Sequence, residues 1–132
     1  MTLRFKVDKL IRDKLPGMMQ AQGLKVFTRR LDDAEFLARL KDKLVEEAAE
    51  ARSATSRTEL IDELADLGEV VLALAQAAGV TQQEIEARRL AKRHERGGFD
   101  ARVHNAAVEG DEASAGVAYY LARPAQYPQD EP

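Results

Sequence analysis

The sequence has no cysteine and no tryptophan among its 132 residues, and only 5% of the residues are aromatic. The absence of cysteine excludes a disulfide framework, thiol catalysis and a cysteine-ligated zinc site. With so few aromatic side chains, the core must be built from Leu, Ala and Val, as in helical bundles. The apolar content of 45% is enough for the modest core of one small domain.

Long apolar runs are also absent, and none approaches the roughly 18–20 residues that span a bilayer. The start of the chain lacks a signal-peptide pattern. We therefore expect a soluble, cytoplasmic protein with no membrane partner. The net charge of −3 is close to balanced. It gives no sign of the positive field that nucleic-acid binding requires, so no nucleic-acid partner is expected.

Three helix-start signals are present instead. Each is a capping box, in which a polar N-cap residue is followed three positions later by Glu. The boxes are Asp32–Glu35, Ser56–Glu59 and Thr81–Glu84. They predict helices to about residue 52, to about residue 78 before Gly79, and to Gly97-Gly98, since glycine commonly ends helices. The expected fold class is all-α.

The ends of the chain give weaker signals. Residues 3–7 alternate apolar and polar side chains, which predicts a short strand or an extended segment. A short helix is expected at about 16–22, and residues 24–31 are expected to be extended. We predict a helical domain over residues 1–100. Residues 101–132 are predicted to be an irregular tail that packs on the bundle or on a partner subunit.

Acidic residues recur at positions i and i+3 in the first two predicted helices. The first helix carries Glu46-Glu47-Ala48-Ala49-Glu50, and the second carries Glu63-Leu64-Ala65-Asp66. Residues with this spacing are neighbours on one helix surface. If the two helices pack side by side, four of the acids converge into one patch of carboxylates: Glu47, Glu50, Glu63 and Asp66.

The helical wheel separates this pattern from an ordinary solvated acidic face. At about 100° per residue, Glu47 falls inside the apolar arc of its helix and Glu50 lies at its border. Glu63 lies inside the apolar arc of the second helix, and Asp66 lies at its edge. An ionised carboxylate left unpaired in such a seam costs several kcal/mol. A shared divalent cation, Mg²⁺ or alternatively Mn²⁺, removes that cost, so we predict a metal site.

The paired motif resembles the metal-binding signature of the all-α nucleoside triphosphate pyrophosphohydrolases, the MazG-like superfamily. The stretch from Lys9 to Pro16 (KLIRDKLP) and Arg96-Gly97-Gly98-Phe99 resemble a subgroup described as phosphoribosyl-ATP pyrophosphohydrolase-like. The resemblance covers roughly residues 8 to 100. It implies a helical bundle completed by dimerisation, and hydrolysis between the α- and β-phosphates of a nucleotide.

Basic residues flank the acidic motifs on both sides. We predict that five of them contact substrate phosphates: Lys9, Arg12, Lys14, Lys92 and Arg96. Arginine suits bidentate phosphate contacts, and lysine acts as a point charge. The alternative is an ordinary solvated basic surface or pairing with acids such as Glu86. Glu46 is the candidate for orienting or deprotonating the attacking water. A solvated helix residue is the competing interpretation for Glu46.

The second predicted helix is apolar around most of its circumference, so it must be covered from more than one direction. This predicts a homodimer or a dimer of dimers. The resemblance implies the same association. All three tyrosines lie beyond residue 100, and they either pack on the protein or stack on the base of a ligand.

Three functions fit these features. The first is the removal of non-standard nucleoside triphosphates. The second is hydrolysis of phosphoribosyl-ATP in histidine biosynthesis, although the stretch from Asp66 to Glu69 lacks the Tyr-His expected of the pathway enzymes. The third is a non-catalytic helical dimer that regulates by binding a nucleotide or a protein.

Overall fold

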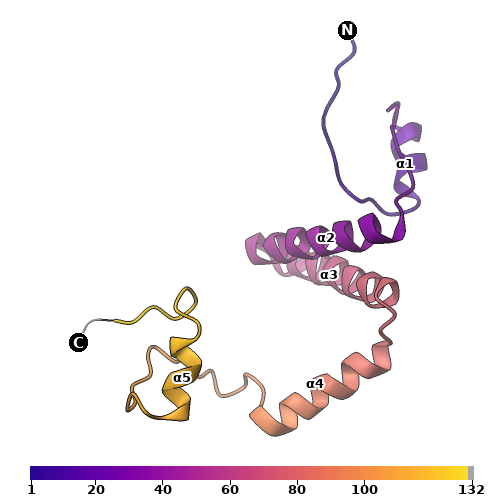
Figure 1. Cartoon of the computed structure of the whole chain (residues 1–132). Helices are drawn as coiled ribbons and strands as arrows, with labels where there is room; N and C mark the ends of the chain where they lie inside the picture. Colours follow the sequence, from indigo (N-terminus) through magenta and orange to yellow (C-terminus); the bar gives the residue numbers. More distant parts are fainter. Residues whose placement is uncertain (131–132) are drawn as a thin grey trace. The chain divides into compact units, whose positions relative to one another are not determined.

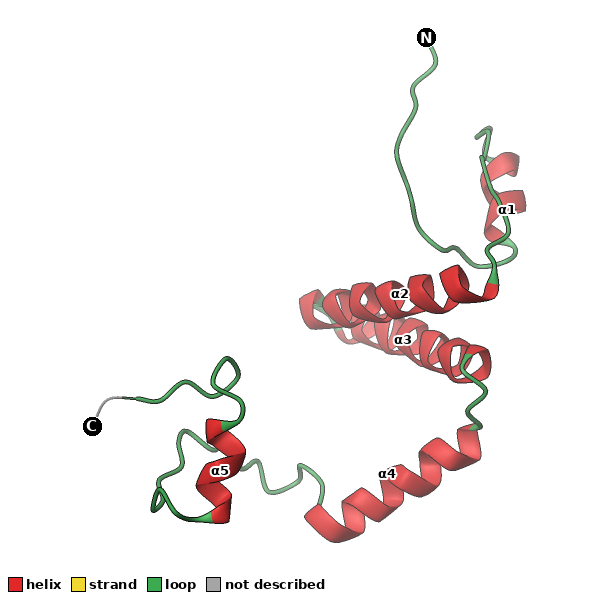
Figure 2. Cartoon of the chain, viewed as in Figure 1, coloured by secondary structure: helices red, strands yellow, loops and turns green. Residues whose placement is uncertain are grey.

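The protein is described by a computed structural model over residues 1–130. It contains five helices: α1 (Leu15–Ala21), α2 (Asp33–Ser53), α3 (Arg57–Ala77), α4 (Gln82–Arg96) and α5 (Ala115–Leu121). No strand occurs in this range (Figure 2). The predicted all-α fold class is confirmed. The chain divides into two compact units, Met1–Glu95 and Arg96–Pro132.

The first unit is built on a hairpin of α2 and α3, two 21-residue helices that lie side by side (Figure 1). The Asp32 side chain caps α2 by accepting a hydrogen bond from the amide of Glu35 at 2.8 Å. At the start of α3, Ser56 Oγ accepts from the amide of Glu59 at 3.1 Å, and the Glu59 side chain accepts from the amide of Thr55 at 3.0 Å. The contacts of Ser56 and Glu59 lie in the turn between the helices, and they help to set the register in which the acids of the two helices meet.

Few side chains are buried in this unit. Among residues 1–130, the buried apolar residues are Leu40 on α2 and Val70 and Ala75 on α3, at 3%, 8% and 8% exposure. They are joined by one acid, Glu47, at 6% exposure. The wheel expectation that Glu47 lies in the seam is therefore confirmed.

The connection from α3 to α4 turns at Gly79, whose φ of 72° favours glycine. Thr81 then caps α4: its hydroxyl accepts from the amide of Glu84 at 3.1 Å, and the Glu84 carboxylate accepts from the amide of Thr81 at 2.7 Å. The two helices are bent by 113° relative to one another. No single helix of residues 1–130 has the length and apolarity to cross a membrane; the bent pair of α3 and α4 meets that test only on length and composition.

The extended segments that precede α2 differ in part from expectation. Residues 3–7 and 24–31 are loops without strand pairing, so the strand alternative for residues 3–7 is wrong and the extended one holds. Neither segment forms a ladder, and an isolated strand has nothing to satisfy its backbone groups. Helix α1 begins at Leu15, and Pro16 occupies its first turn, where proline is tolerated.

The second unit is more regular than an irregular tail, because it contains α5. Ser114 caps this helix by accepting a hydrogen bond from the amide of Val117 at 3.3 Å. The short cap-and-turn pattern was too brief to be distinguished from a loop in the sequence. The proposed packing of residues 101–132 on the bundle or on a partner stays a prediction, and residues 131–132 lie outside the described range.

The three tyrosines of the second unit pack on one another. The ring centroids of Tyr119 and Tyr120 are 5.1 Å apart, and those of Tyr120 and Tyr127 are 4.9 Å apart, both in edge-to-face geometry. The Arg123 guanidinium lies 3.9 Å from the centroid of Tyr119. The rings therefore form a small local cluster around α5. Neither predicted use of the tyrosines, packing on the bundle or stacking on a ligand, is tested by this contact.

Candidate metal centre

Three of the four predicted metal ligands meet between α2 and α3. Glu47, Glu50 and Glu63 each offer a carboxylate oxygen, and these oxygens all lie within 4.8 Å of one another. Glu47 is buried, Glu63 is half-buried and Glu50 is exposed. The cluster is thus closed on its helix side and open on its Glu50 side. We call these three residues the acid cluster.

Two oxygens of the acid cluster lack a partner. Oε2 of Glu47 and Oε2 of Glu63 are buried, and neither has a hydrogen-bond donor. A buried acceptor without a donor is destabilising, and more so when it carries charge. Each of these two acids therefore holds one buried carboxylate oxygen that an additional positive group would stabilise.

Two acids of the cluster, Glu47 and Glu63, resist ionisation. Burial raises the pKa of Glu47, and the neighbouring Glu50 raises it further. Burial, followed by a hydrogen bond with Glu50 and the charges of Glu50, Asp66 and Glu47, raises the pKa of Glu63 to about 7. Like charges at close range disfavour ionisation of both groups. A cation placed between the carboxylates reverses this effect.

The donor set fits a hard divalent cation. Mg²⁺ prefers carboxylate oxygens and usually keeps several waters, so it needs few protein ligands. The acid cluster provides only carboxylate oxygens, and two of them have no competing partner. The acid cluster could therefore hold such an ion.

Asp66, the fourth predicted ligand, is engaged elsewhere. Its Oδ1 accepts a hydrogen bond from Arg12 Nη2 at 2.8 Å, and it is not among the three acids whose oxygens meet. It still lies three residues after Glu63 on the same face of α3. Its charge also contributes to the raised pKa of Glu63. Asp66 is thus a neighbour of the acid cluster that is paired with a cation.

Glu46 is paired with two lysines. Its carboxylate accepts hydrogen bonds from Lys9 Nζ at 2.6 Å and from Lys43 Nζ at 3.3 Å. The hydrogen bond from Lys9, with a smaller effect from Lys43, lowers the pKa of Glu46. This carboxylate is held in its ionised form beside the acid cluster. Its predicted role toward water stays a prediction.

Sequence reasoning missed Lys43. Its Nζ lies 3.5 Å from Oε1 of Glu47 as well as close to Glu46, and its side chain is 22% exposed. It is the basic group that contacts the buried acid, and it leaves the other oxygen of Glu47 free for the cluster. The signal was available, because Lys43 precedes the two acids by three and four residues on one helix.

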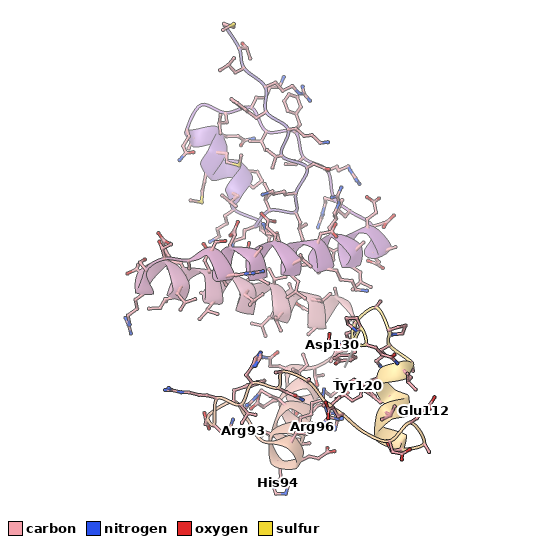
Figure 3. The ribbon with its side chains drawn as sticks, turned by 90° about the vertical axis from the view of Figure 1, so that its left-hand side faces the viewer. Arg93, His94, Arg96, Glu112, Tyr120 and Asp130 are labelled. Carbon is pink, nitrogen blue, oxygen red and sulfur yellow. The ribbon has the colours of Figure 1, made fainter. Side chains whose placement is uncertain are left out.

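The other three residues that were predicted to contact phosphate make no hydrogen bond or ion pair with the acid cluster within residues 1–130. Lys14, Lys92 and Arg96 are exposed, and none has an ion pair within residues 1–130. On α4, Arg89 pairs with Glu86 at 2.6 Å, which is the solvated pairing that the sequence also allowed. The exposed side chain of His94 projects outward from α4 (Figure 3).

Comparison with known proteins identifies the family. A profile described as phosphoribosyl-ATP pyrophosphohydrolase matches residues 12–94, which include both acidic motifs. An uncharacterized protein of Mycolicibacterium smegmatis is 43% identical over 49 residues, covering 37% of this chain and 50% of that protein. The match thus spans half the length of this relative. No solved structure matches. The chain belongs to the phosphoribosyl-ATP pyrophosphohydrolase family, within the MazG-like all-α nucleoside triphosphate pyrophosphohydrolase superfamily.

Proposed function

We propose that this protein is a Mg²⁺-dependent nucleotide pyrophosphohydrolase that releases a nucleoside monophosphate and pyrophosphate. The observation that carries the proposal is the acid cluster, whose Glu47 and Glu63 each keep one buried carboxylate oxygen without a donor. Family membership supports pyrophosphohydrolase activity in general. The proposal adds the bond, between the α- and β-phosphates, and the cation, Mg²⁺ or Mn²⁺.

The acid cluster supplies the first ligands of the cation. Glu47, Glu50 and Glu63 would hold it, and Asp66 on the same face of α3 would complete the set. When bound, such an ion polarises phosphoryl oxygens and lowers the pKa of a coordinated water.

Glu46 is suited to orient the attacking water rather than to act as a strong base. Lys9 and Lys43 hold its carboxylate ionised and fix its position. Because its pKa is lowered, Glu46 stays ionised and can accept a hydrogen bond from water, but it is a weak proton acceptor. In this proposal Glu46 aligns the water next to the acid cluster.

The basic side chains would neutralise charge on the phosphates. Lys9 and Arg12 are the best placed, because each already contacts an acid at the edge of the acid cluster. Lys14 lies two residues beyond Arg12. Lys92 and Arg96 complete the proposed set from the last turns of α4.

Two substrates compete within this class. We favour non-standard nucleoside triphosphates, because Asp66 is followed by Leu67-Gly68-Glu69 and not by the Tyr-His expected in the histidine pathway. The description of the matching family favours phosphoribosyl-ATP. The product monophosphates differ, so the two can be distinguished by assay.

We further propose that a second copy of the chain covers α3. Much of its apolar surface is exposed, even though α2 packs along one side. The exposed apolar residues of α3 include Leu60, Ile61, Leu64, Val71 and Leu72. A second pair of α2 and α3 would complete a four-helix core.

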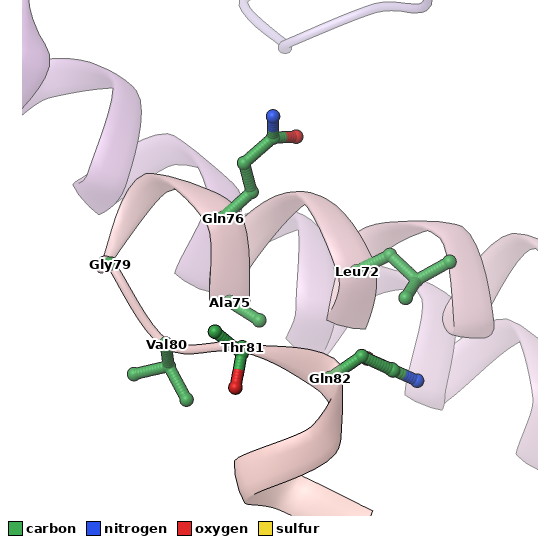
Figure 4. Close-up of a pocket in the computed structure, with 7 residues that line it drawn as sticks. All are labelled: Leu72, Ala75, Gln76, Gly79, Val80, Thr81 and Gln82. Carbon is green, nitrogen blue, oxygen red and sulfur yellow. The ribbon is translucent and has the colours of Figure 1, made fainter.

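The junction of α3 and α4 adds to the surface that a second copy would cover. An open groove of about 500 Å³ lies there, lined in part by Leu72, Ala75 and Val80 (Figure 4). Its lining is largely apolar, which suits the side chains of another helix more than a phosphate. The groove therefore supports the proposed dimer and has no role in the proposed chemistry.

The test is release of pyrophosphate from a panel of nucleotides with Mg²⁺. The panel contains standard and oxidised or deaminated triphosphates and phosphoribosyl-ATP. Turnover of the non-standard triphosphates with abolished turnover in Glu47→Gln supports the proposal. Activity confined to phosphoribosyl-ATP assigns the other substrate. No turnover of any member, with Mg²⁺ binding equal in wild type and Glu47→Gln, supports the non-catalytic regulator instead.

A further inference from the structure

A short segment at the start of the chain binds both helices that carry the acid cluster. We call residues 8–12 the N-terminal arm. It makes one ion pair with the middle of α2, one with the acid next to Glu47, and one with α3. These pairs are Asp8 with Arg39 at 2.9 Å, Lys9 with Glu46 at 2.6 Å, and Arg12 with Asp66 at 2.8 Å.

The middle of the arm is anchored differently from its cations. Leu10 and Ile11 are half-buried, whereas the side chains of Lys9 and Arg12 are 52% and 57% exposed. The arm starts at Asp8, whose φ of 46° is uncommon for a residue other than glycine. The half-buried Leu10 and Ile11 therefore hold the arm in place, while its two cations stay accessible to solvent.

The ion pairs of the arm are of a kind that exchanges easily. Exposed pairs between a basic side chain and a carboxylate contribute little stability, since water screens them. Arg12 uses one nitrogen on one oxygen of Asp66, and leaves the rest of its guanidinium fork available. A phosphate can engage that fork through two parallel hydrogen bonds and carries more charge than a carboxylate.

We infer that the N-terminal arm is an exchangeable counter-charge of the two acids that border the acid cluster, Glu46 and Asp66. Without a cation, Lys9 and Arg12 neutralise Glu46 and Asp66. When a divalent ion neutralises the acid cluster, Asp66 turns to the ion and Arg12 passes to the phosphates of the ligand. Lys9, whose ammonium group has three donors, contacts the phosphates while it stays bound to Glu46. This inference rests on the proposed function and adds an order of binding: the metal ion binds first, and only then does Arg12 of the arm become available for phosphate.

The inference predicts effects of opposite sign from one substitution. In Arg12→Gln, Mg²⁺ alone should bind about three- to fivefold tighter, because a competitor for Asp66 is removed. Inorganic pyrophosphate with Mg²⁺ should bind at least about tenfold weaker, because the guanidinium is lost. Both affinities are measured by calorimetry on the full chain. Lys6→Gln removes the same charge from a nearby exposed residue without an ion pair in residues 1–130, and should change either affinity less than about twofold.

If Arg12→Gln changes both affinities in the same direction, or changes them no more than Lys6→Gln does, the inference about the N-terminal arm is overturned while the proposed metal site stands. If wild type binds no Mg²⁺, or binds it as Glu47→Gln does, the proposed function and the inference are both overturned.

Discussion

Glu47 on α2 and Glu63 on α3 face a common point, and each keeps one buried carboxylate oxygen that no donor reaches. The two residues come from different helices, so the hairpin itself creates this arrangement. In a small protein with few buried apolar side chains, such a pair is destabilising unless it serves a ligand. The stability of the protein without metal should therefore respond to these two acids in a characteristic way.

The first prediction concerns stability without a divalent ion. Glu47→Gln removes a buried charge from the acid cluster while keeping the shape of the side chain, so the free energy of unfolding in EDTA should rise by on the order of 1 kcal/mol. Urea denaturation measures the change. Glu69→Gln on the exposed side of α3 is the control, and it should stay within about 0.5 kcal/mol of wild type. A Glu47→Gln variant that is less stable than wild type would mean that the carboxylate is already well paired.

The second prediction is a pH dependence set by Glu63. Its pKa is about 7 in the folded protein, against an ordinary value of 4.5. Between these values the folded state keeps a proton that the unfolded chain has released, so the unfolded state is increasingly favoured as the pH rises. Stability without metal should be greatest at the acidic end of this window, and the contribution of Glu63 should be lost above pH 7.

The check is denaturation in EDTA from pH 5 to pH 8, with wild type and Glu63→Gln side by side. The variant has no titrating group at this position, so its stability should vary less with pH across this range. Glu46 has a lowered pKa and acts in the opposite direction, but only at pH values below the ordinary range of a carboxyl. A wild-type stability that increases steadily from pH 5 to pH 7.5 contradicts the assignment.

The third prediction tests the proposed dimer. Leu64 is 52% exposed on α3, and Leu64→Asp places a charge in the surface that a second copy would cover. We expect wild type to be dimeric or tetrameric by light scattering, and the variant to be monomeric at micromolar concentration. Leu24→Asp is the matched control, since Leu24 is 49% exposed and lies in the loop between α1 and α2. A monomeric wild type ends the dimer proposal.

The fourth prediction concerns the turn that sets the register of the acids. Ser56→Ala removes the hydroxyl that caps α3 and should lower the free energy of unfolding by about 1 kcal/mol. Ser53→Ala, at the end of α2, removes a serine that caps no helix and should have a smaller effect. Mg²⁺ affinity should be unchanged in Ser56→Ala at temperatures where the variant is folded. A variant as stable as wild type would show that packing of α2 on α3 alone sets the turn.

The helices and the buried acid could be predicted from the sequence because their signals are local. The capping boxes predicted the starts of α2, α3 and α4, and the helical wheel placed Glu47 in the seam. The wheel needs only the spacing of apolar residues along one helix. The convergence of acids from α2 and α3 followed once the helices were taken as neighbours.

The partners of the basic residues could not be predicted, because they depend on distant parts of the chain. Arg12 and Asp66 are 54 residues apart, and Lys9 and Glu46 are 37 apart. The sequence suggested phosphate for these cations, whereas the structure shows them paired with acids. The strand alternative for residues 3–7 failed for a related reason, since strand formation depends on a partner elsewhere in the chain.

The most direct test of the metal centre is a calorimetric titration of Mg²⁺ into wild type, Glu47→Gln, Glu63→Gln and Glu69→Gln. If the acid cluster holds the ion, wild type and Glu69→Gln bind Mg²⁺ with equal affinity. Glu47→Gln and Glu63→Gln stay folded but bind Mg²⁺ at least about tenfold more weakly. Equal binding in all four proteins, or no binding in wild type, contradicts the proposed metal centre.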